Sequence, residues 1–330
     1  MAAAIRASCV CNPKESSMIA YAIRRVLIAI PTLFIVLTIT FVLIRIAPGD
    51  PAQVRLGDYA SKESVEALRA QMGLDKSVWV QYLDTLKGLV QGDFGRSMVN
   101  GRPISKDLTR SLPYTLELTL VGIIFGALVG VPTGVYTALK RNTLADYLGR
   151  TLSLGGLSFP TFYLGILLML ALAIKIPVFP VVGGGDLHNL AENLYHLFLP
   201  GLTLGLIMTA YVTRMTRSSV LNILNEDYVR TARAKGLAER KVIYKHLLRN
   251  ALLPITALIG VYAIVLIGGS VMVEIVFSRP GLGKMMIGAL KQRDYTTLQA
   301  VMITFTSFVV LINLLTDLMY GLIDPRVRFK

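Results

Sequence analysis

Residues 118–139 read LTLVGIIFGALVGVPTGVYTAL, a stretch without a single charge in which Gly122, Gly126, Gly130 and Gly134 recur at intervals of four. About 20 apolar residues in a helix span the hydrocarbon core of a bilayer. Residues four apart share one side of a helix, so the glycines form a stripe along which another helix can approach closely. The stretch predicts a central membrane-spanning helix that packs through this stripe, within the chain or at a subunit interface.

Five further apolar runs without charged residues lie on either side of this stretch. The six runs together are 26–44, 118–139, 151–174, 197–213, 250–273 and 295–316, the last continuing to about residue 323. A helix is the economical way to satisfy backbone hydrogen bonds in lipid. The sequence therefore predicts an all-α integral membrane protein with six transmembrane helices, and Pro31, Pro132 and Pro160 are candidates for kinks in them.

The charge of the chain fits a membrane protein better than a soluble one. The 330 residues are 54% hydrophobic and 16% charged, yet their formal net charge is +14. With the N-terminus inside, the cytosolic segments are 1–25, 140–150, 214–249 and 324–330, which hold 19 Lys and Arg against six Asp and Glu. This is the positive-inside pattern, so both termini are expected in the cytosol. A nucleic-acid surface would not alternate between loops in this way.

These assignments divide the chain into parts. Residues 1–25 form a cytosolic tail, 26–45 the first span, and 46–113 a small extracytoplasmic subdomain. A core domain of five spans covers 114–323 and includes the cytosolic loop 214–249, and 324–330 form the cytosolic C-terminus. Because the polar residues 1–17 have no apolar centre, no cleavable signal peptide is expected.

The extracytoplasmic subdomain is expected to be mostly helical. A turn is predicted at 48–51, a helix at 61–72 with Ser61 as its N-cap, and a second short helix at 80–90. Gly92, Gly95, Gly101 and Pro103 then interrupt the chain. The subdomain either caps the ends of the spans or provides a docking surface for an external partner.

Few side chains suggest a site inside the membrane. Glu117, Glu274 and Asp317, which follows Asn313 by one helical turn, lie near span ends rather than at mid-membrane, and this favours structural pairing over a proton relay. No metal site is expected. Cys9 and Cys11 form an isolated C-x-C that is read as reduced thiols, and the histidines, His188, His196 and His246, are scattered.

The loop 214–249 contains a short helix with clear start and stop signals. Asn225 is a good N-cap, Glu226 and Asp227 suit the first turn, and Arg230, Arg233 and Lys235 follow. Gly236 is a natural stop. These signals predict a helix at 226–235 with a modest apolar edge, followed by a second helix from about 238 that leads into the fifth span.

This loop resembles the cytosolic coupling loop of bacterial ABC importer permeases, especially those of the dipeptide and oligopeptide branch. The resemblance rests on EDYVRTARAKGL at 226–237 and HLLRNALLP at 246–254. Shorter family-like pieces follow along nearly the whole chain: PGDP at 48–51, GDFGRS at 92–97, PGLG at 280–283, RDY at 293–295 and DPRVR at 324–328. The sequence departs from the general family pattern at two places. Arg230, Thr231 and Ala232 stand where the motif has Glu-Ala-Ala, so its acidic residue is absent. Arg249 stands where many of these permeases have a proline.

The resemblance implies a type I ABC importer permease fold and a multi-pass protein of the bacterial inner membrane. The partners that it implies are a homologous second permease, two ATP-binding subunits and an extracytoplasmic solute-binding protein that docks near 46–113 and 274–294. The residues that it assigns to contact with the ATPase are Glu226, Asp227, Tyr228, Arg230, Thr231, Ala232, Arg233, Lys235 and Gly236. Glycine at 236 would end the coupling helix.

No catalytic or cofactor site is expected in this chain. The one Gly-Lys pair, Gly283-Lys284, is followed by Met285 and lacks the first glycine of a phosphate-binding loop, so ATP and Mg²⁺ are assigned to the separate ATPase subunits. The function expected from the resemblance is import of di- or oligopeptides. The alternatives are a nickel chelate, glutathione or another small solute as cargo, or, in a different class, an ATP-independent secondary transporter or channel.

Overall fold

The computed structural model describes residues 13–46, 50–57 and 60–323. Cys9 and Cys11, the first two residues of the turn predicted at 48–51, and the C-terminal segment 324–330 lie outside these residues. The described part folds into helices, with one isolated antiparallel bridge between Arg96 and Pro103.

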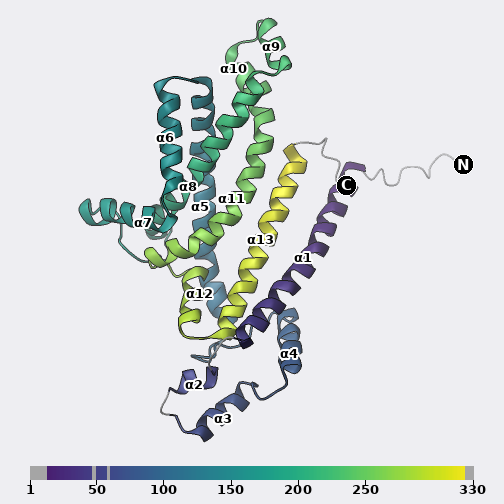
Figure 1. The fold of residues 1–330 in the computed structure, drawn as a ribbon, viewed down its shortest axis with the longest axis vertical. Coiled ribbons are helices and arrows are strands. Elements are labelled where there is room, and N and C mark those ends of the chain that lie inside the picture. The colour runs from purple at the N-terminus through teal and green to yellow at the C-terminus, as the bar shows by residue number, and fades with distance from the viewer. Residues whose placement is uncertain (1–12, 47–49, 58–59, 324–330) are drawn as a thin grey trace, which may run out of the picture.

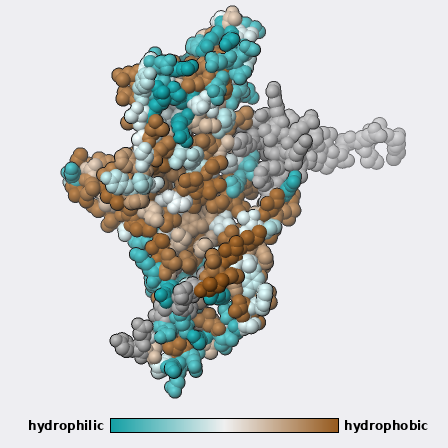
Figure 2. Space-filling model, viewed as in Figure 1, coloured by the Kyte–Doolittle hydropathy of each residue, from teal (hydrophilic) through white to brown (hydrophobic). Residues whose placement is uncertain are grey.

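Five helices in the described residues are long and apolar enough to cross a membrane. They are α1 (Pro13–Ile46), α5 (Ile104–Leu139), α8 (Leu190–Leu224), α11 (Arg249–Val276) and α13 (Tyr295–Ile323). α11 is entered through α10 (Glu239–Lys241) and the π-helical segment η2 (Val242–Leu248). Most of these helices are considerably longer than the apolar runs that predicted them. In Figure 2, hydrophobic side chains surround the middle of the molecule and hydrophilic ones gather toward its two ends.

The third predicted span, at 151–174, is a bent pair of helices, and the break falls at Pro160, one of the predicted kink positions. It consists of α6 (Leu144–Ser158), α7 (Thr161–Met169) and the π-helical η1 (Leu170–Lys175), and the chain bends by 102° between α6 and α7. Proline has no N–H to donate and disfavours helical geometry in the residue before it. Phe159 is accordingly extended, with φ −91° and ψ 133°. The six predicted spans are therefore five helices and one bent pair, whereas α1 and α5 continue unbroken through Pro31 and Pro132.

The centre of the fold is the contact between α5 and α8. The stripe glycines of α5 lie against successive turns of α8: Gly122 against Leu204, Gly126 against Met208, Gly130 against Val212 and Gly134 against Thr216. Residue numbers rise together along both helices, so the pair is parallel. In return, Gly201 and Gly205 of α8 accommodate Val121 and Phe125. The stripe is thus covered within the chain and is not an open surface for another subunit.

The predicted outer segment contains three short helices, α2 (Pro51–Leu56), α3 (Lys62–Gln71) and α4 (Val78–Val90). Ser61 caps α3 as predicted, since its side chain accepts a hydrogen bond of 3.2 Å from the Ser64 N–H. After a loop at 91–103, α5 begins at Ile104, ten residues before the predicted boundary at 114. Near the other end of the chain, α12 (Leu282–Lys291) connects α11 to α13. The short α9 (Asp227–Ala234) lies between α8 and α10. Figure 1 shows α2, α3 and α4 at one end of the molecule and α9 and α10 at the other.

Candidate functional site

The candidate coupling element is α9 (Asp227–Ala234), which follows α8 after only two residues. The prediction of Asn225 as its N-cap is wrong by one position. Asn225 instead ends α8, with φ −93° and ψ −3°, and Glu226 is the N-cap in extended geometry without a side-chain hydrogen bond. The reason is that α8 stays helical as far as Leu224, so Asn225 is the residue on which the long helix ends.

The inner face of α9 is apolar and packs on its own chain. Val229 and Ala232 are buried together with Val242 of η2, and Ile223 and Leu237 complete this small cluster. Full burial of a valine-sized side chain stabilises the folded state by about 1.5–3 kcal/mol relative to leaving that side chain exposed. The cluster holds α9 against the end of α8 and against η2, the segment that leads into α11.

Polar contacts hold α9 in the same orientation. Arg233 donates two hydrogen bonds to Glu239, of 3.1 Å from Nε and 2.6 Å from Nη2. This interaction raises the pKa of Arg233 above its usual value. Tyr228 Oη accepts a hydrogen bond of 2.8 Å from Asn250 Nδ2 at the start of α11. Each pair is exposed and worth only about 0.2–1 kcal/mol, so these contacts set geometry more than stability.

The outer face of α9 carries most of the residues assigned to ATPase contact. Those exposed to solvent are Glu226, Asp227, Tyr228, Arg230, Thr231, Arg233, Lys235 and Gly236, whereas Ala232 is buried. Ala232 is therefore a packing residue in this chain, not part of the projecting surface. Gly236 has φ +74° and no atom within 4 Å of a hypothetical Cβ, so backbone conformation and not space restricts this position to glycine.

The part of α8 that leads to α9 is also connected to α6. Asp146, at the start of α6, is fully buried and accepts hydrogen bonds of 2.6 and 2.9 Å from Nε and Nη2 of Arg217 on α8. The Asn142 N–H donates to the same carboxylate at 3.0 Å. α8 is therefore fixed to α5 along its length and to α6 near the end that carries α9.

At the opposite end, two of the family-like pieces meet. Asp294 accepts hydrogen bonds from Ser97 Oγ at 2.5 Å and from the Met98 N–H at 3.0 Å. It also accepts bonds from the N–H and hydroxyl of Thr297, 3.2 and 2.8 Å long, at the start of α13. The pieces GDFGRS and RDY are thus the two sides of one junction, which fixes the predicted outer segment to the α12–α13 turn.

The PGLG piece surrounds a buried carboxylate. Glu274 accepts hydrogen bonds from Thr115 Oγ1 at 2.6 Å and from the N–H groups of Gly283 and Lys284 at 2.7 and 3.1 Å. A Cβ at Gly281 would lie 2.4 Å from the Glu274 carboxyl carbon, so only glycine fits there. This carboxylate therefore has structural partners in α5 and α12.

An ion pair between a buried arginine and a partly buried glutamate lies beside Glu274. The fully buried Arg279 forms an ion pair with Glu117 through Nη2, and its Nη1 donates to the Gly184 carbonyl at 3.2 Å. Asn193 at the start of α8 donates to the other Glu117 oxygen at 2.7 Å. Glu117 thus also has structural partners. Sequence reasoning did not find Arg279 or Asn193, because nothing local indicates which distant carboxylate each one meets.

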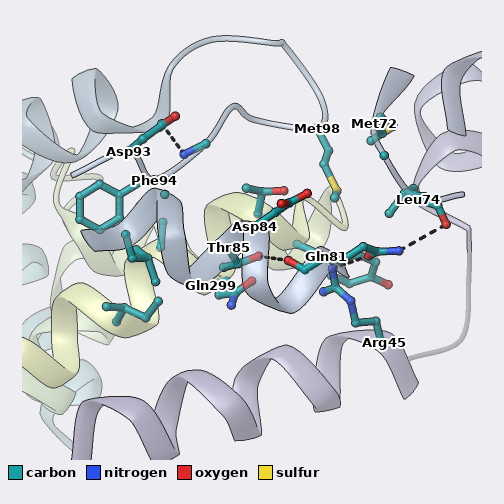
Figure 3. A pocket seen from close by; sticks show the side chains of 18 of the residues that line it. Arg45, Met72, Leu74, Gln81, Asp84, Thr85, Asp93, Phe94, Met98 and Gln299 are labelled. Carbon is teal, nitrogen blue, oxygen red and sulfur yellow. Dashed lines mark hydrogen bonds between the residues drawn. The ribbon is translucent and has the colours of Figure 1, made fainter. Parts of the chain in front are cut away.

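A cavity of about 270 Å³ lies between the end of α1, α4, the loop after α4 and α13. Its walls combine polar groups of Arg45, Gln81, Asp84 and Gln299 with apolar groups such as Phe94 (Figure 3). Within the described ranges, no group of three or more His, Cys, Asp or Glu side chains could hold a metal ion.

Bundled apolar helices that are closely packed through glycine, with a short helix projecting from one end, define a multi-pass membrane protein. The comparisons with known proteins identify it further. Residues 130–329 match the family model "Binding-protein-dependent transport system inner membrane component", and residues 18–119 match the model of the N-terminal part of such components. The chain belongs to this family, and it is the permease subunit of an ABC importer in the inner membrane.

Relatives and solved structures agree with this assignment. The chain is 40% identical to the glutathione transport system permease protein GsiC of Escherichia coli (strain K12) over 313 residues, which are 95% of this chain and all of the relative. Identity to GsiC of Salmonella typhimurium (strain LT2) is 41% over the same lengths. An inward-facing structure of the MetNI methionine ABC transporter matches 66% of this chain and 96% of its own, with TM-score 0.53 and 23% identity, and it supports the fold alone. The alternative of an ATP-independent secondary transporter or channel is therefore not supported.

Proposed function

We propose that this permease forms half of the translocation path of an importer for short peptides, glutathione included, and that α9 couples it to a separate ATPase. The cargo is inferred from the full-length similarity to a glutathione permease. Glutathione is itself a tripeptide, so that cargo and the dipeptide or oligopeptide cargo suggested by the coupling loop are of one chemical class. A nickel chelate is a less favoured cargo, because the relatives named above are glutathione permeases.

The observation that carries the coupling proposal is the two-sided construction of α9. Its apolar residues, Val229 and Ala232, attach it to α8 and η2, while its charged residues project outward. A force applied to the projecting face would therefore reach α8 and α11 without passing through a flexible loop. That is the property required of an element that transmits nucleotide-driven closure to the spans.

The proposed complex contains this chain, a homologous second permease, two ATP-binding subunits and a solute-binding protein. ATP and Mg²⁺ would bind to the ATP-binding subunits, and this chain would be a transport subunit without enzymatic activity of its own. The binding protein would dock at the end formed by 46–113 and 274–294. Support for a single docking surface comes from the Asp294 junction, which joins these two segments.

Reconstitution tests this proposal. The complex is assembled in liposomes with its ATP-binding subunits, and uptake of radiolabelled glutathione and of di- and tripeptides is measured with the binding protein outside. We expect ATP-dependent uptake of at least one of these peptides, with ATP hydrolysis stimulated by the loaded binding protein. Uptake without any ATP-binding subunit, or uptake restricted to non-peptide solutes, would refute the proposal.

A further inference from the structure

We propose that α4 lies in the membrane itself, where one side of the helix contacts lipid in the leaflet at the Arg45 end of α1. The contacting side is an apolar stripe made of Trp79, Leu83, Leu86 and Val90, which follow each other at helical intervals of four, three and four. From its position in the chain, this helix would be assigned to an aqueous subdomain.

The stripe is too exposed to suit contact with water. Trp79, Leu83 and Val90 are 77%, 61% and 88% exposed, and Leu86 is half-buried. Each Å² of apolar surface that is removed from water contributes about 25 cal/mol of favourable free energy, which exposed apolar side chains do not gain. Trp79 is the only tryptophan of the chain, and tryptophan is enriched where a membrane meets water.

The depth of α4 follows from Tyr82, whose side chain contacts the middle of α1. Its ring lies edge-on to those of Phe34 and Phe41, with centroids 6.2 and 5.1 Å away, and its hydroxyl is 2.6 Å from Thr38 Oγ1. All three partners lie inside the apolar span Val26–Leu43. At 1.5 Å per residue, Thr38 and Phe34 are roughly 8 and 14 Å from the Leu43 end of that span.

This depth matches that of helices which lie in the membrane interface. Such helices bury their apolar side about 5–10 Å into the boundary between headgroups and acyl chains. Figure 1 shows α4 beside the end of α1. A helix whose side chains reach a transmembrane segment at this level cannot have both of its sides in bulk water.

The polar side of α4 is satisfied away from the stripe. Gln81 Oε1 accepts a hydrogen bond of 2.8 Å from Arg45 Nη2, and Gln81 Nε2 donates to the Lys76 carbonyl at 2.9 Å. Asp84 pairs with Lys76 at 2.9 Å. These groups and Thr85 face the 270 Å³ cavity (Figure 3), so their polar atoms point away from the stripe.

Lipid is the occupant that the neighbouring surface indicates. Exposed apolar side chains of α1, among them Ile35, Ile39, Val42 and Leu43, belong to the same span that Tyr82 contacts. The helix that carries the stripe is therefore packed on a transmembrane helix whose own exposed surface is apolar. A second permease subunit is the other possible occupant, and the experiment below includes it as an outcome.

The fluorescence of the single tryptophan provides the first test. The full chain is reconstituted in phosphatidylcholine vesicles with bromine at positions 6 and 7 of one acyl chain, and quenching is compared with that by aqueous iodide. We expect the bromolipid to quench Trp79 strongly and iodide to quench it weakly. A matched control carries Trp79→Phe and Glu66→Trp, which moves the probe to the exposed face of α3 and should reverse the preference. A Trp79 signal that is quenched by iodide and not by bromolipid would overturn the proposal.

The assembled complex provides the second test. Trp79 is replaced by the photoreactive p-benzoylphenylalanine in the full chain, and the complex is irradiated in native membranes. We expect adducts with phospholipid, detected by mass spectrometry on the peptide that contains position 79. Quantitative crosslinking to another protein subunit would show that protein covers the stripe, and would equally overturn the proposal.

Discussion

Replacement of Gly126 by alanine tests whether the contact between α5 and α8 depends on the absence of a side chain. A Cβ at this position would lie 2.2 Å from Met208 Cγ, 2.4 Å from Met208 Cβ and 3.1 Å from the Met208 carbonyl carbon. Non-bonded carbon atoms are comfortable at about 3.5–4.0 Å. A different rotamer can move Cγ but not Cβ, so the two helices have to separate by roughly 1 Å. Overpacking of this kind destabilises a core by about 1–3 kcal/mol.

The assay is thermal stability in mild detergent, measured as the fraction of protein that remains monodisperse after heating. Gly268→Ala is the matched control, because Gly268 lies in a membrane-spanning helix, α11, and has no atom within 4 Å of its hypothetical Cβ. We expect Gly126→Ala to lower the midpoint temperature clearly and Gly268→Ala to leave it unchanged or raise it slightly. Equal midpoints for the two variants would refute the reasoning from the glycine stripe.

Three further predictions concern the two ends of the molecule. Gly236→Val should leave assembly of the complex intact, because no atom crowds position 236. It imposes about 1–3 kcal/mol of backbone strain at φ +74° and should reduce peptide uptake per ATP hydrolysed. Unchanged uptake per ATP would contradict the role of α9. Asp294→Asn replaces a charged acceptor of four hydrogen bonds. The free energy that protects amides of the 91–103 loop from hydrogen exchange should fall by about 1.5–3 kcal/mol. Unaltered exchange rates in this loop would argue against the junction. Gly281→Ala brings a Cβ within 2.4 Å of the Glu274 carboxyl group and should lower thermal stability. Gly288→Ala, inside the helix α12 that follows Gly281, places its Cβ where nothing lies within 4 Å and should not lower it. Matching stabilities of the two variants would show that the pocket around Glu274 can expand.

Local patterns predicted the parts of the fold that depend on local physics. The apolar runs located the spanning helices because bilayer thickness and backbone hydrogen bonding leave few alternatives. The spacing of Gly122 to Gly134 indicated a packed stripe, and Ser61 marked the start of α3. Each of these signals is contained within a few turns of helix.

The wrong or missing predictions depended on more distant parts of the chain. Pro160 was recognised as a possible kink, but the size of the bend depends on how α6 and α7 pack on other helices. Asn225 has the right chemistry for an N-cap, yet it ends α8 because the long helix in front of it continues to Leu224. The partner of Arg279 is 162 residues away in the chain, so only the folded arrangement reveals the pair with Glu117.

The length of α8 has a mechanical consequence. The first turn of the helix contains Asn193, which belongs to the charge network of Glu117 and Arg279, and its last residue, Leu224, lies just before the junction with α9. Its 35 residues correspond to a rod of about 52 Å. A rod that tilts about its midpoint moves its two tips by equal amounts in opposite directions. If α8 pivoted about its midpoint, a displacement of α9 would therefore reach the Glu117–Arg279 pair with its size preserved and its direction reversed, as in a lever with arms of equal length.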